Sequence, residues 1–226
     1  MGKRYSENIK NIDKLKDYDI SEAVSLLKSM GKPNFDETVE VAVNLGVDPK
    51  HADQIIRGTV SLPHGTGNDV KILVIAKGDA IDAAKEAGAD YYGAEEYLDK
   101  IKGGWTDVDV IVSTPDMMVE VGKLGRVLGP RGLMPNPKSG TVTTDVSRAV
   151  VELKAGKIEF RVEKEGILHV GIGKMSFEEN QIIDNFNAFI DTIVKLRPNA
   201  LKGRYIKRIS LSSTMSPGFR INNEYN

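Results

Sequence analysis

The stretch Val70-Lys71-Ile72-Leu73-Val74-Ile75-Ala76 is a nearly continuous run of apolar residues inside a chain of 226 residues. A run of this length, rich in Val and Ile, is typical of a strand buried on both faces, as in a parallel sheet covered by helices. An alanine-rich helical pattern over 79–88 follows it and closes on a glycine. The run therefore predicts an α/β layer in the middle of the chain.

The alternation of strand and helix continues after this run. The sequence predicts further strands near 89–92 and 108–112, and helices over 94–101, 115–124 and 144–155. Strands and helices that alternate in this way indicate a small parallel or mostly parallel sheet wrapped by helices, which is a Rossmann-like arrangement.

The two flanks of this layer follow a different pattern. Before it, a helix is expected over 21–30 and a half-buried strand over 38–45, where Val and Leu alternate with polar residues. After it, strands over 157–162 and 167–172 are expected to form a hairpin around Glu165-Gly166. A long amphipathic helix over 176–196 and an alternating strand over 205–213 complete the chain.

The alternating pattern of half-buried strands stops at the apolar run and returns after the α/β layer, so the sequence predicts two domains. Residues 1–67 and 159–226 form a discontinuous α+β domain with an antiparallel sheet, and residues 68–158 form an inserted Rossmann-like α/β domain. An insertion leaves two neighbouring crossing strands. Glycines in these strands supply the backbone freedom of a hinge, and the predicted hinge residues are Gly65, Gly67 and Gly156.

Positive charge is gathered locally on a chain whose net charge is -1. Seven basic residues and no acidic one lie between Lys195 and Arg220, and a second acid-free stretch, 121–144, carries four more. Either stretch also fits a solvated cationic segment, and the charge pattern alone does not decide between the two readings. Two such strips on separate domains favour two contacts with nucleic acid.

Several classes of function lack their signatures. The chain has no cysteine, and its three histidines are far apart, so we expect no metal site, no thiol chemistry and no cofactor. No dinucleotide fingerprint, phosphate-binding loop or nucleophile elbow occurs, and the chain is not expected to be an enzyme. No run reaches the roughly 20 apolar residues of a membrane span, so we expect a cytoplasmic protein with no membrane partner.

Three motifs, in order, carry a resemblance to a known family. They are Arg57-Gly58-Thr59-Val60-Ser61-Leu62-Pro63-His64-Gly65-Thr66-Gly67, then Leu128-Gly129-Pro130-Arg131-Gly132-Leu133-Met134-Pro135-Asn136-Pro137-Lys138, then Ser213-Thr214-Met215. Together they resemble the L-one family of large-subunit ribosomal proteins, the proteins of the mobile stalk beside the tRNA exit site. The resemblance implies the same two-domain fold, with the ribosomal RNA site on the discontinuous domain.

The resemblance and the charge pattern together give the candidate site residues. Candidates for the ribosomal RNA contact are Phe35, Thr38, Lys174, Lys202, Arg204, Arg208, Ser213, Thr214, Met215 and Ser216. Candidates for the tRNA contact are Arg57, Arg126, Arg131 and Lys138. The family usually has glycine where this chain has Ser216, which puts a close backbone approach at that position in question and allows a hydroxyl contact in its place.

As in the family, the expected partners are large-subunit ribosomal RNA, exit-site tRNA and the messenger of the protein's own operon. The resemblance implies a ribosomal constituent that assists release of deacylated tRNA, represses translation of its own messenger and is a monomer when free. The alternative is an RNA-binding translational repressor without a ribosomal role.

Overall fold

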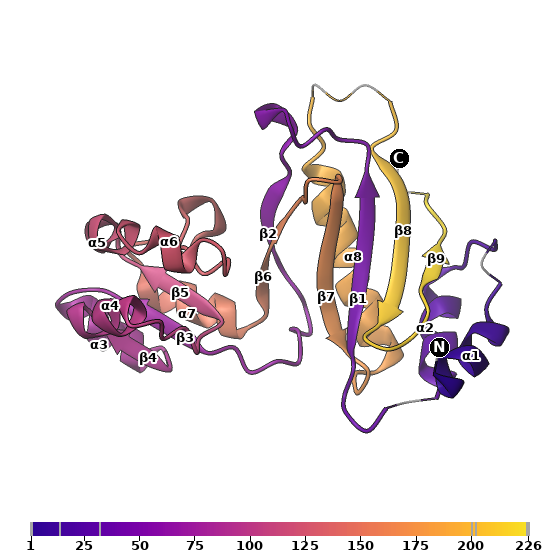
Figure 1. Cartoon of the computed structure of the whole chain (residues 1–226), viewed down its shortest axis with the longest axis horizontal. Helices are drawn as coiled ribbons and strands as arrows, with labels where there is room; N and C mark the ends of the chain where they lie inside the picture. Colours follow the sequence, from indigo (N-terminus) through magenta and orange to yellow (C-terminus); the bar gives the residue numbers. More distant parts are fainter. Residues whose placement is uncertain (1, 14, 32, 200, 202, 225–226) are drawn as a thin grey trace. The chain divides into compact units, whose positions relative to one another are not determined.

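The computed structural model describes residues 2–13, 15–31, 33–199, 201 and 203–224. Contacts within the chain divide it into two compact units: Met1–Gly67 with Ile158–Asn226, and Asn68–Lys157. The first unit contains an antiparallel sheet and the second a parallel sheet (Figure 1). The predicted mixture of α+β and α/β structure is therefore present.

The first unit is built on a four-stranded sheet in the order β7-β1-β8-β9. The central strand β1 (Thr38–Leu45) pairs antiparallel with β7 (Ile167–Lys174) and with β8 (Ile206–Ser213). The short strand β9 (Phe219–Ile221) pairs antiparallel with β8. Thus β1, from the first part of the chain, lies between two strands from the last part.

One face of this sheet is buried and the other is wet, as the alternation in 38–45 predicts. Val39, Val41 and Val43 are fully buried, whereas Glu40 on the opposite face is exposed. The buried face is covered by α8 (Glu179–Lys195), which lies behind the sheet in Figure 1, and by α2 (Ile20–Ser29). The apolar stripe of α8 is fully buried in the same core: Ile182, Phe186, Phe189, Ile190 and Ile193.

The helix α8 begins later than predicted. Its cap is Glu178, whose side chain accepts a hydrogen bond from the backbone at Gln181 while the Gln181 side chain binds the backbone of Glu178. This reciprocal capping fixes the start of the helix. Ser176 is left outside it, where its hydroxyl and its N–H both donate to the Asp36 carboxylate.

The predicted hairpin between 157–162 and 167–172 is wrong. The strand β6 (Lys157–Arg161) pairs with β2 (Arg57–Ser61) in a separate two-stranded sheet, while β7 belongs to the four-stranded sheet. The N–H of Val162 donates to the carbonyl of Ile56 at 2.8 Å. A turn at 163–167 therefore joins two sheets, because β6 forms its hydrogen bonds with β2 and β7 forms its hydrogen bonds with β1.

The N-terminal segment packs on the edge of the first unit. It contains α1 (Lys3–Asn8), the 3₁₀ turn Ile9–Asn11 and a bridge between Tyr18 and Ile221 of β9. Another 3₁₀ turn, Ala52–Gln54, precedes β2. Tyr18 is buried, and its ring meets Phe219 edge to face.

The second unit is a three-stranded parallel sheet in the order β4-β3-β5. Its strands are β3 (Ile72–Ile75), β4 (Tyr91–Gly93) and β5 (Val110–Ser113). Leu73 and Ile75 pack into one hydrophobic cluster, whereas Ile72 and Val74 pack into another. Both faces of β3 are covered, which is the physical reason for the continuous apolar run.

Helices form the two covering layers of this sheet. The cluster around Leu73 includes residues from α4 (Glu95–Lys102), α5 (Met118–Gly122) and α6 (Gly125–Leu128). The cluster around Val74 includes residues from α3 (Asp79–Glu86) and α7 (Val146–Lys154). The predicted helix over 115–124 is divided into a 3₁₀ turn, Pro115–Met117, and α5.

The basic stretch 125–138 is partly helical. It begins with α6, and a 3₁₀ turn at Pro137–Ser139 follows it. Leu128 is fully buried and anchors this stretch to the unit. Among the helices described in either unit, none is long and apolar enough to cross a membrane.

Candidate nucleic-acid interface

The start of β1 and the end of β8 meet at one end of the four-stranded sheet. The N–H of Thr38 donates to Oγ1 of Thr214 at 3.1 Å, and the N–H of Thr214 donates to the carbonyl of Thr38 at 3.1 Å. The last residue of β7, Lys174, donates from Nζ to Oγ1 of Thr38 at 2.9 Å. Antiparallel pairing thus gathers three polar side chains from segments far apart in sequence.

These residues and their neighbours form what we call the strand-end surface: Phe35, Thr38, Lys174, Thr214, Met215 and Ser216. Phe35 is 53% exposed and Met215 is 50% exposed. Exposed large apolar side chains indicate a binding surface more than buried ones do, because burial in the core would stabilise the fold. Here they lie beside hydroxyl groups and a cation. The surface has the mixture of flat apolar contact, hydrogen-bonding groups and positive charge that an RNA backbone can meet.

The loop after β8 is fixed from beneath by a buried carboxylate. Glu37 is 4% exposed, and its Oε1 accepts a hydrogen bond from the N–H of Met215 at 2.8 Å. The hydroxyl of Ser216 accepts from the N–H of Ser213 at 2.8 Å. Ser216 therefore uses its side chain to close the turn, so at this position the hydroxyl is engaged within the protein.

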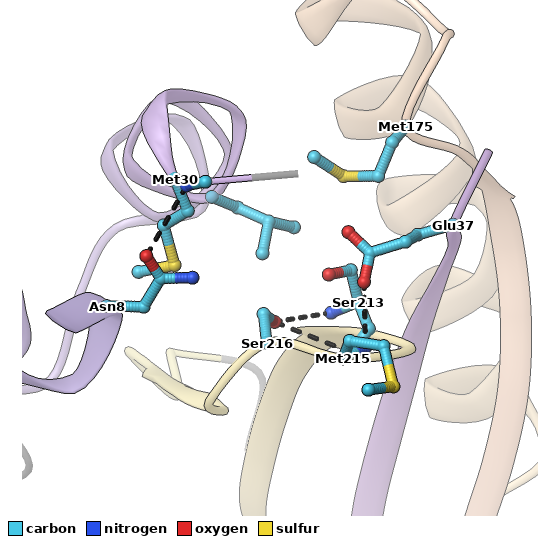
Figure 2. Close-up of a pocket in the computed structure, with 9 residues that line it drawn as sticks. Asn8, Met30, Glu37, Met175, Ser213, Met215 and Ser216 are labelled. Atoms are coloured by element: carbon cyan, nitrogen blue, oxygen red, sulfur yellow. Dashed lines mark hydrogen bonds between the residues drawn. The ribbon is translucent and has the colours of Figure 1, made fainter. Parts of the chain in front are cut away.

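A small pocket lies under this loop (Figure 2). Glu37, Ser213, Met215 and Ser216 line one part of it, and Asn8 reaches it from α1. Ser213 is 4% exposed, and its hydroxyl has no hydrogen-bond partner within the described structure. Ser213, predicted as an RNA contact, thus lies beneath the strand-end surface and not on it.

A buried amide supports the surface from behind. Asn185 of α8 is fully buried, and its Nδ2 donates to the carbonyls of Ile172 at 2.7 Å and Gly65 at 2.9 Å. Its Oδ1 accepts from the N–H of His64 at 3.1 Å. Ile172 is the extra residue of a β-bulge between β7 and β1, so Asn185 pairs a carbonyl that the ladder leaves free.

The turn after β2, which Asn185 holds through His64 and Gly65, reaches Lys174 of the strand-end surface at Gly67. Gly67 has φ of 73°, and a Cβ there would lie 2.8 Å from Cγ of Lys174 and 2.8 Å from the ring of Phe177. Only glycine fits this close approach. Gly65 and Gly156 also have positive φ, 66° and 98°, and the hinge role of all three glycines stays a prediction.

Sequence reasoning missed Glu37 and Asn185. A glutamate between an aspartate and a threonine at a strand start gives no sign of burial. Asn185 interrupts the apolar stripe of α8 between Ile182 and Phe186, and a polar residue at a core position of a helix was the signal that could have found it.

The basic residues near the C-terminus do not join the strand-end surface. Arg204 precedes β8, whose two ends are about 23 Å apart for an eight-residue strand. Arg208 lies near that same end, and Arg220 is paired with Asp17 through Nε and Oδ1 at 2.5 Å. Lys202 lies outside the described residues. The contacts of Arg204 and Arg208 with RNA stay predictions, located away from Thr38 and Thr214.

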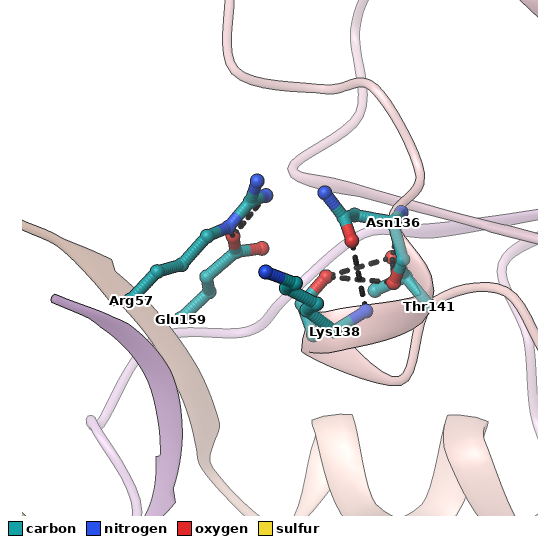
Figure 3. A network of polar contacts seen from close by, with 6 residues as sticks. Arg57, Asn136, Lys138, Thr141 and Glu159 are labelled. Carbon is teal, nitrogen blue, oxygen red and sulfur yellow. Dashed lines mark hydrogen bonds and ion pairs between the residues drawn. The ribbon is translucent and has the colours of Figure 1, made fainter. Parts of the chain in front are cut away.

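The tRNA candidates occur in two different settings. In the first unit the Arg57 guanidinium is paired with the Glu159 carboxylate, with Nε 2.6 Å from Oε1 (Figure 3). In the second unit Arg126, Arg131 and Lys138 are exposed. Oδ1 of Asn136 accepts from the N–H of Lys138 at 2.8 Å, an Asx turn that orders this part of the stretch (Figure 3).

Among the residues that the structure describes, no group of three or more His, Asp or Glu residues is arranged to hold a metal ion. His64 lies 2.9 Å from Asp184 on the surface of α8, where the pair helps to hold the turn after β2.

The sequence model of the Ribosomal protein L1p/L10e family matches residues 26–217. The chain belongs to this family. It is therefore a large-subunit ribosomal protein that binds ribosomal RNA, in a family whose members are structural and RNA-binding proteins. The match spans both units and includes the strand-end surface.

Proposed function

We propose that the strand-end surface is the ribosomal RNA site of this protein. The observation that carries the proposal is the direct pairing of Thr38 with Thr214, which holds exposed Phe35 and Met215 at the same end of one sheet. Backbone hydrogen bonds and the buried Glu37 fix this end of the sheet, so little ordering is required when RNA binds.

Each group has a chemical role in the proposed site. Phe35 and Met215 give flat apolar contact for ribose or base. The Lys174 ammonium has three donors, of which one goes to Thr38, so it retains capacity for a phosphate. The hydroxyls of Thr38 and Thr214 suit the 2′-hydroxyl of ribose, through which a protein distinguishes RNA from DNA.

We also propose that the two units act as the two domains of the stalk protein. The discontinuous domain, 1–67 with 159–226, holds ribosomal RNA, and the inserted domain, 68–158, faces exit-site tRNA. The exposed Arg126, Arg131 and Lys138 are the tRNA contacts in this proposal, because they are cations on one acid-free stretch. Arg57 contributes less, since its charge is compensated by Glu159.

Free protein acts in the cytoplasm as a monomer and uses the same surface to bind the messenger of its own operon. Binding there represses translation when protein exceeds ribosomal RNA. This follows from the proposal because a surface that reads RNA shape accepts any RNA that presents that shape.

Filter binding tests the RNA site. The full chain is measured against a large-subunit ribosomal RNA fragment, the leader of its own messenger and an unrelated RNA of equal length. We expect the first to bind tightest, the second more weakly and the third only at low salt. Thr214→Val should weaken the first two by roughly tenfold through loss of the hydroxyl. The control Thr192→Val, on α8, should leave both unchanged. Equal binding of all three RNAs would reject the proposal.

A second experiment tests the tRNA role. Ribosomes carrying Arg126→Ser and Arg131→Ser should release deacylated tRNA at an altered rate while the protein retains its affinity for the ribosomal RNA fragment. Loss of that affinity would show that the second unit contributes to the ribosomal RNA site.

A further inference from the structure

The helix α1 lies outside the residues that the family model matches, yet it borders the pocket beneath the strand-end surface. Asn8, the last residue of this helix, is buried and lines the pocket together with Met215 and Ser216. Its Oδ1 accepts a hydrogen bond from the N–H of Gly31 at 3.4 Å (Figure 2). The helix is therefore attached to the same end of the sheet that carries the proposed RNA site.

Arg4 lies one helical turn before Asn8, on the same face of α1. Its side chain packs on Gly31, where a Cβ would come 3.3 Å from Cγ and 3.5 Å from Cδ of the arginine. The absence of a side chain at position 31 makes room for this aliphatic stem. Packing of the stem holds the guanidinium in place before any ligand arrives.

The charge of Arg4 is uncompensated within the described structure. No carboxylate among the described residues forms an ion pair with it, whereas Arg57, Arg148 and Arg220 are each paired. The stretch Lys3 to Lys10 holds three basic residues and one acidic residue, Glu7. A part-exposed, pre-positioned guanidinium without a partner is suited to a phosphate group, which it can bind in bidentate fashion.

We propose that Arg4 binds a backbone phosphate of the RNA held by the strand-end surface, so that α1 extends the RNA site beyond the family-matched residues. This inference rests on the proposed function. Gly31 lines the same pocket as Met215, and the Arg4 stem lies against Gly31, which places this arginine beside the pocket under the strand-end surface. The ligand we propose is a phosphodiester, whose oxygens a guanidinium fork can bind in bidentate fashion.

The test is a salt titration of the full chain with the ribosomal RNA fragment. Removal of one phosphate contact lowers the slope of log affinity against log salt by about 0.7 to 0.9. Arg4→Ala should reduce affinity roughly tenfold and lower the slope by about that amount. Arg4→Lys keeps the charge and should retain the slope, with a smaller loss of affinity. The control Arg148→Ala removes an exposed arginine of α7 and should change neither quantity.

Two further measurements keep the outcomes distinct. Circular dichroism should show that Arg4→Ala is folded, and Met215→Glu reports on the strand-end surface itself. If Met215→Glu loses binding while Arg4→Ala changes neither affinity nor slope, the proposed function stands and this inference is overturned. A loss of affinity at unchanged slope would also overturn it, because Arg4 would then act only by packing on Gly31.

Discussion

Replacement of Gly67 by alanine tests how the turn after β2 supports the proposed RNA site. At φ of 73°, alanine is strained by about 1 kcal/mol or more relative to glycine. Its Cβ would lie 2.8 Å from Cγ of Lys174 and from the Phe177 ring, against about 3.5 to 4.0 Å for an ordinary carbon contact. The lysine stem is the more mobile neighbour, so it is the group that must move.

Displacement of Lys174 removes its hydrogen bond to Oγ1 of Thr38, which contributes about 1 kcal/mol. Strain and the lost bond together predict that Gly67→Ala lowers the free energy of unfolding of the first unit by about 2 kcal/mol. Because Lys174 is also a proposed phosphate ligand, affinity for the ribosomal RNA fragment should fall roughly tenfold. Denaturant unfolding and filter binding measure the two quantities.

A matched control and a second background separate the causes. Gly78 also has positive φ, 61°, but a Cβ there would meet nothing within 4 Å, so Gly78→Ala reports strain alone and should leave RNA affinity unchanged. In a Lys174→Ala background there is no lysine stem to displace, and Gly67→Ala should have no further effect on affinity. Wild-type affinity in Gly67→Ala, or an equal loss in both backgrounds, would refute the reasoning.

Two further changes test the support of the first unit. Asn185→Ala leaves two carbonyls and one N–H without partners in the core, so the free energy of unfolding should fall by about 3 kcal/mol. The control Asn187→Ala, on the exposed face of α8, should change the free energy of unfolding by less than about 0.5 kcal/mol. A loss below about 1 kcal/mol for Asn185→Ala would argue against the hydrogen-bond network. Burial raises the pKa of Tyr205 to about 12, so the folded state favours the neutral phenol; its contribution to stability is complete below about pH 10 and is lost as pH rises from about 10 to 12. Tyr205→Phe should flatten stability against pH in that window, and an unchanged slope would contradict the assignment.

Local patterns predicted the elements of this fold well. The continuous apolar run 70–76 predicted a strand buried on both faces, and β3 (Ile72–Ile75), which lies within it, is covered by helices on both faces. The alternation in 38–45 predicted a half-buried strand, and β1 has one buried face and one open face. The α8 stripe likewise follows from a period of 3.6 residues. Each of these signals lies within one element and needs no knowledge of its neighbours.

Strand partners were less predictable than strands. The hairpin expected around Glu165-Gly166 was wrong because β6 and β7 each pair with a strand from the first part of the chain. Adjacent strands joined by a glycine turn look alike whether they pair with each other or not. The alternation within β6 and β7 predicts which side chains are buried, but it does not predict which strand each of them pairs with.

The site was predicted in part for the same reason. Phe35, Thr38, Lys174 and Thr214 were named through the family resemblance, and the antiparallel register brings Thr38 together with Lys174 and Thr214. Arg204, grouped with Thr214 as part of one basic strip, precedes β8 whereas Thr214 follows it. The order of charged residues in a sequence does not show that the strand between them places Arg204 and Thr214 at opposite ends of the sheet.

The measurement that tests the central claim most directly compares two substitutions of exposed apolar residues by glutamate. Met215 lies on the strand-end surface, while Val119 lies on α5 and is 72% exposed. Val119→Glu should change stability by less than about 0.5 kcal/mol, because the side chain is at the surface. Met215→Glu places a second carboxylate near buried Glu37, so denaturant unfolding is used to show that this variant is folded at the temperature of the binding assay. Met215→Glu places a carboxylate against the proposed RNA backbone and should reduce affinity for the ribosomal RNA fragment by tenfold or more, on the order of 1.4 kcal/mol, whereas Val119→Glu should not. Equal affinity in the two variants would contradict the assignment of RNA binding to this end of the sheet.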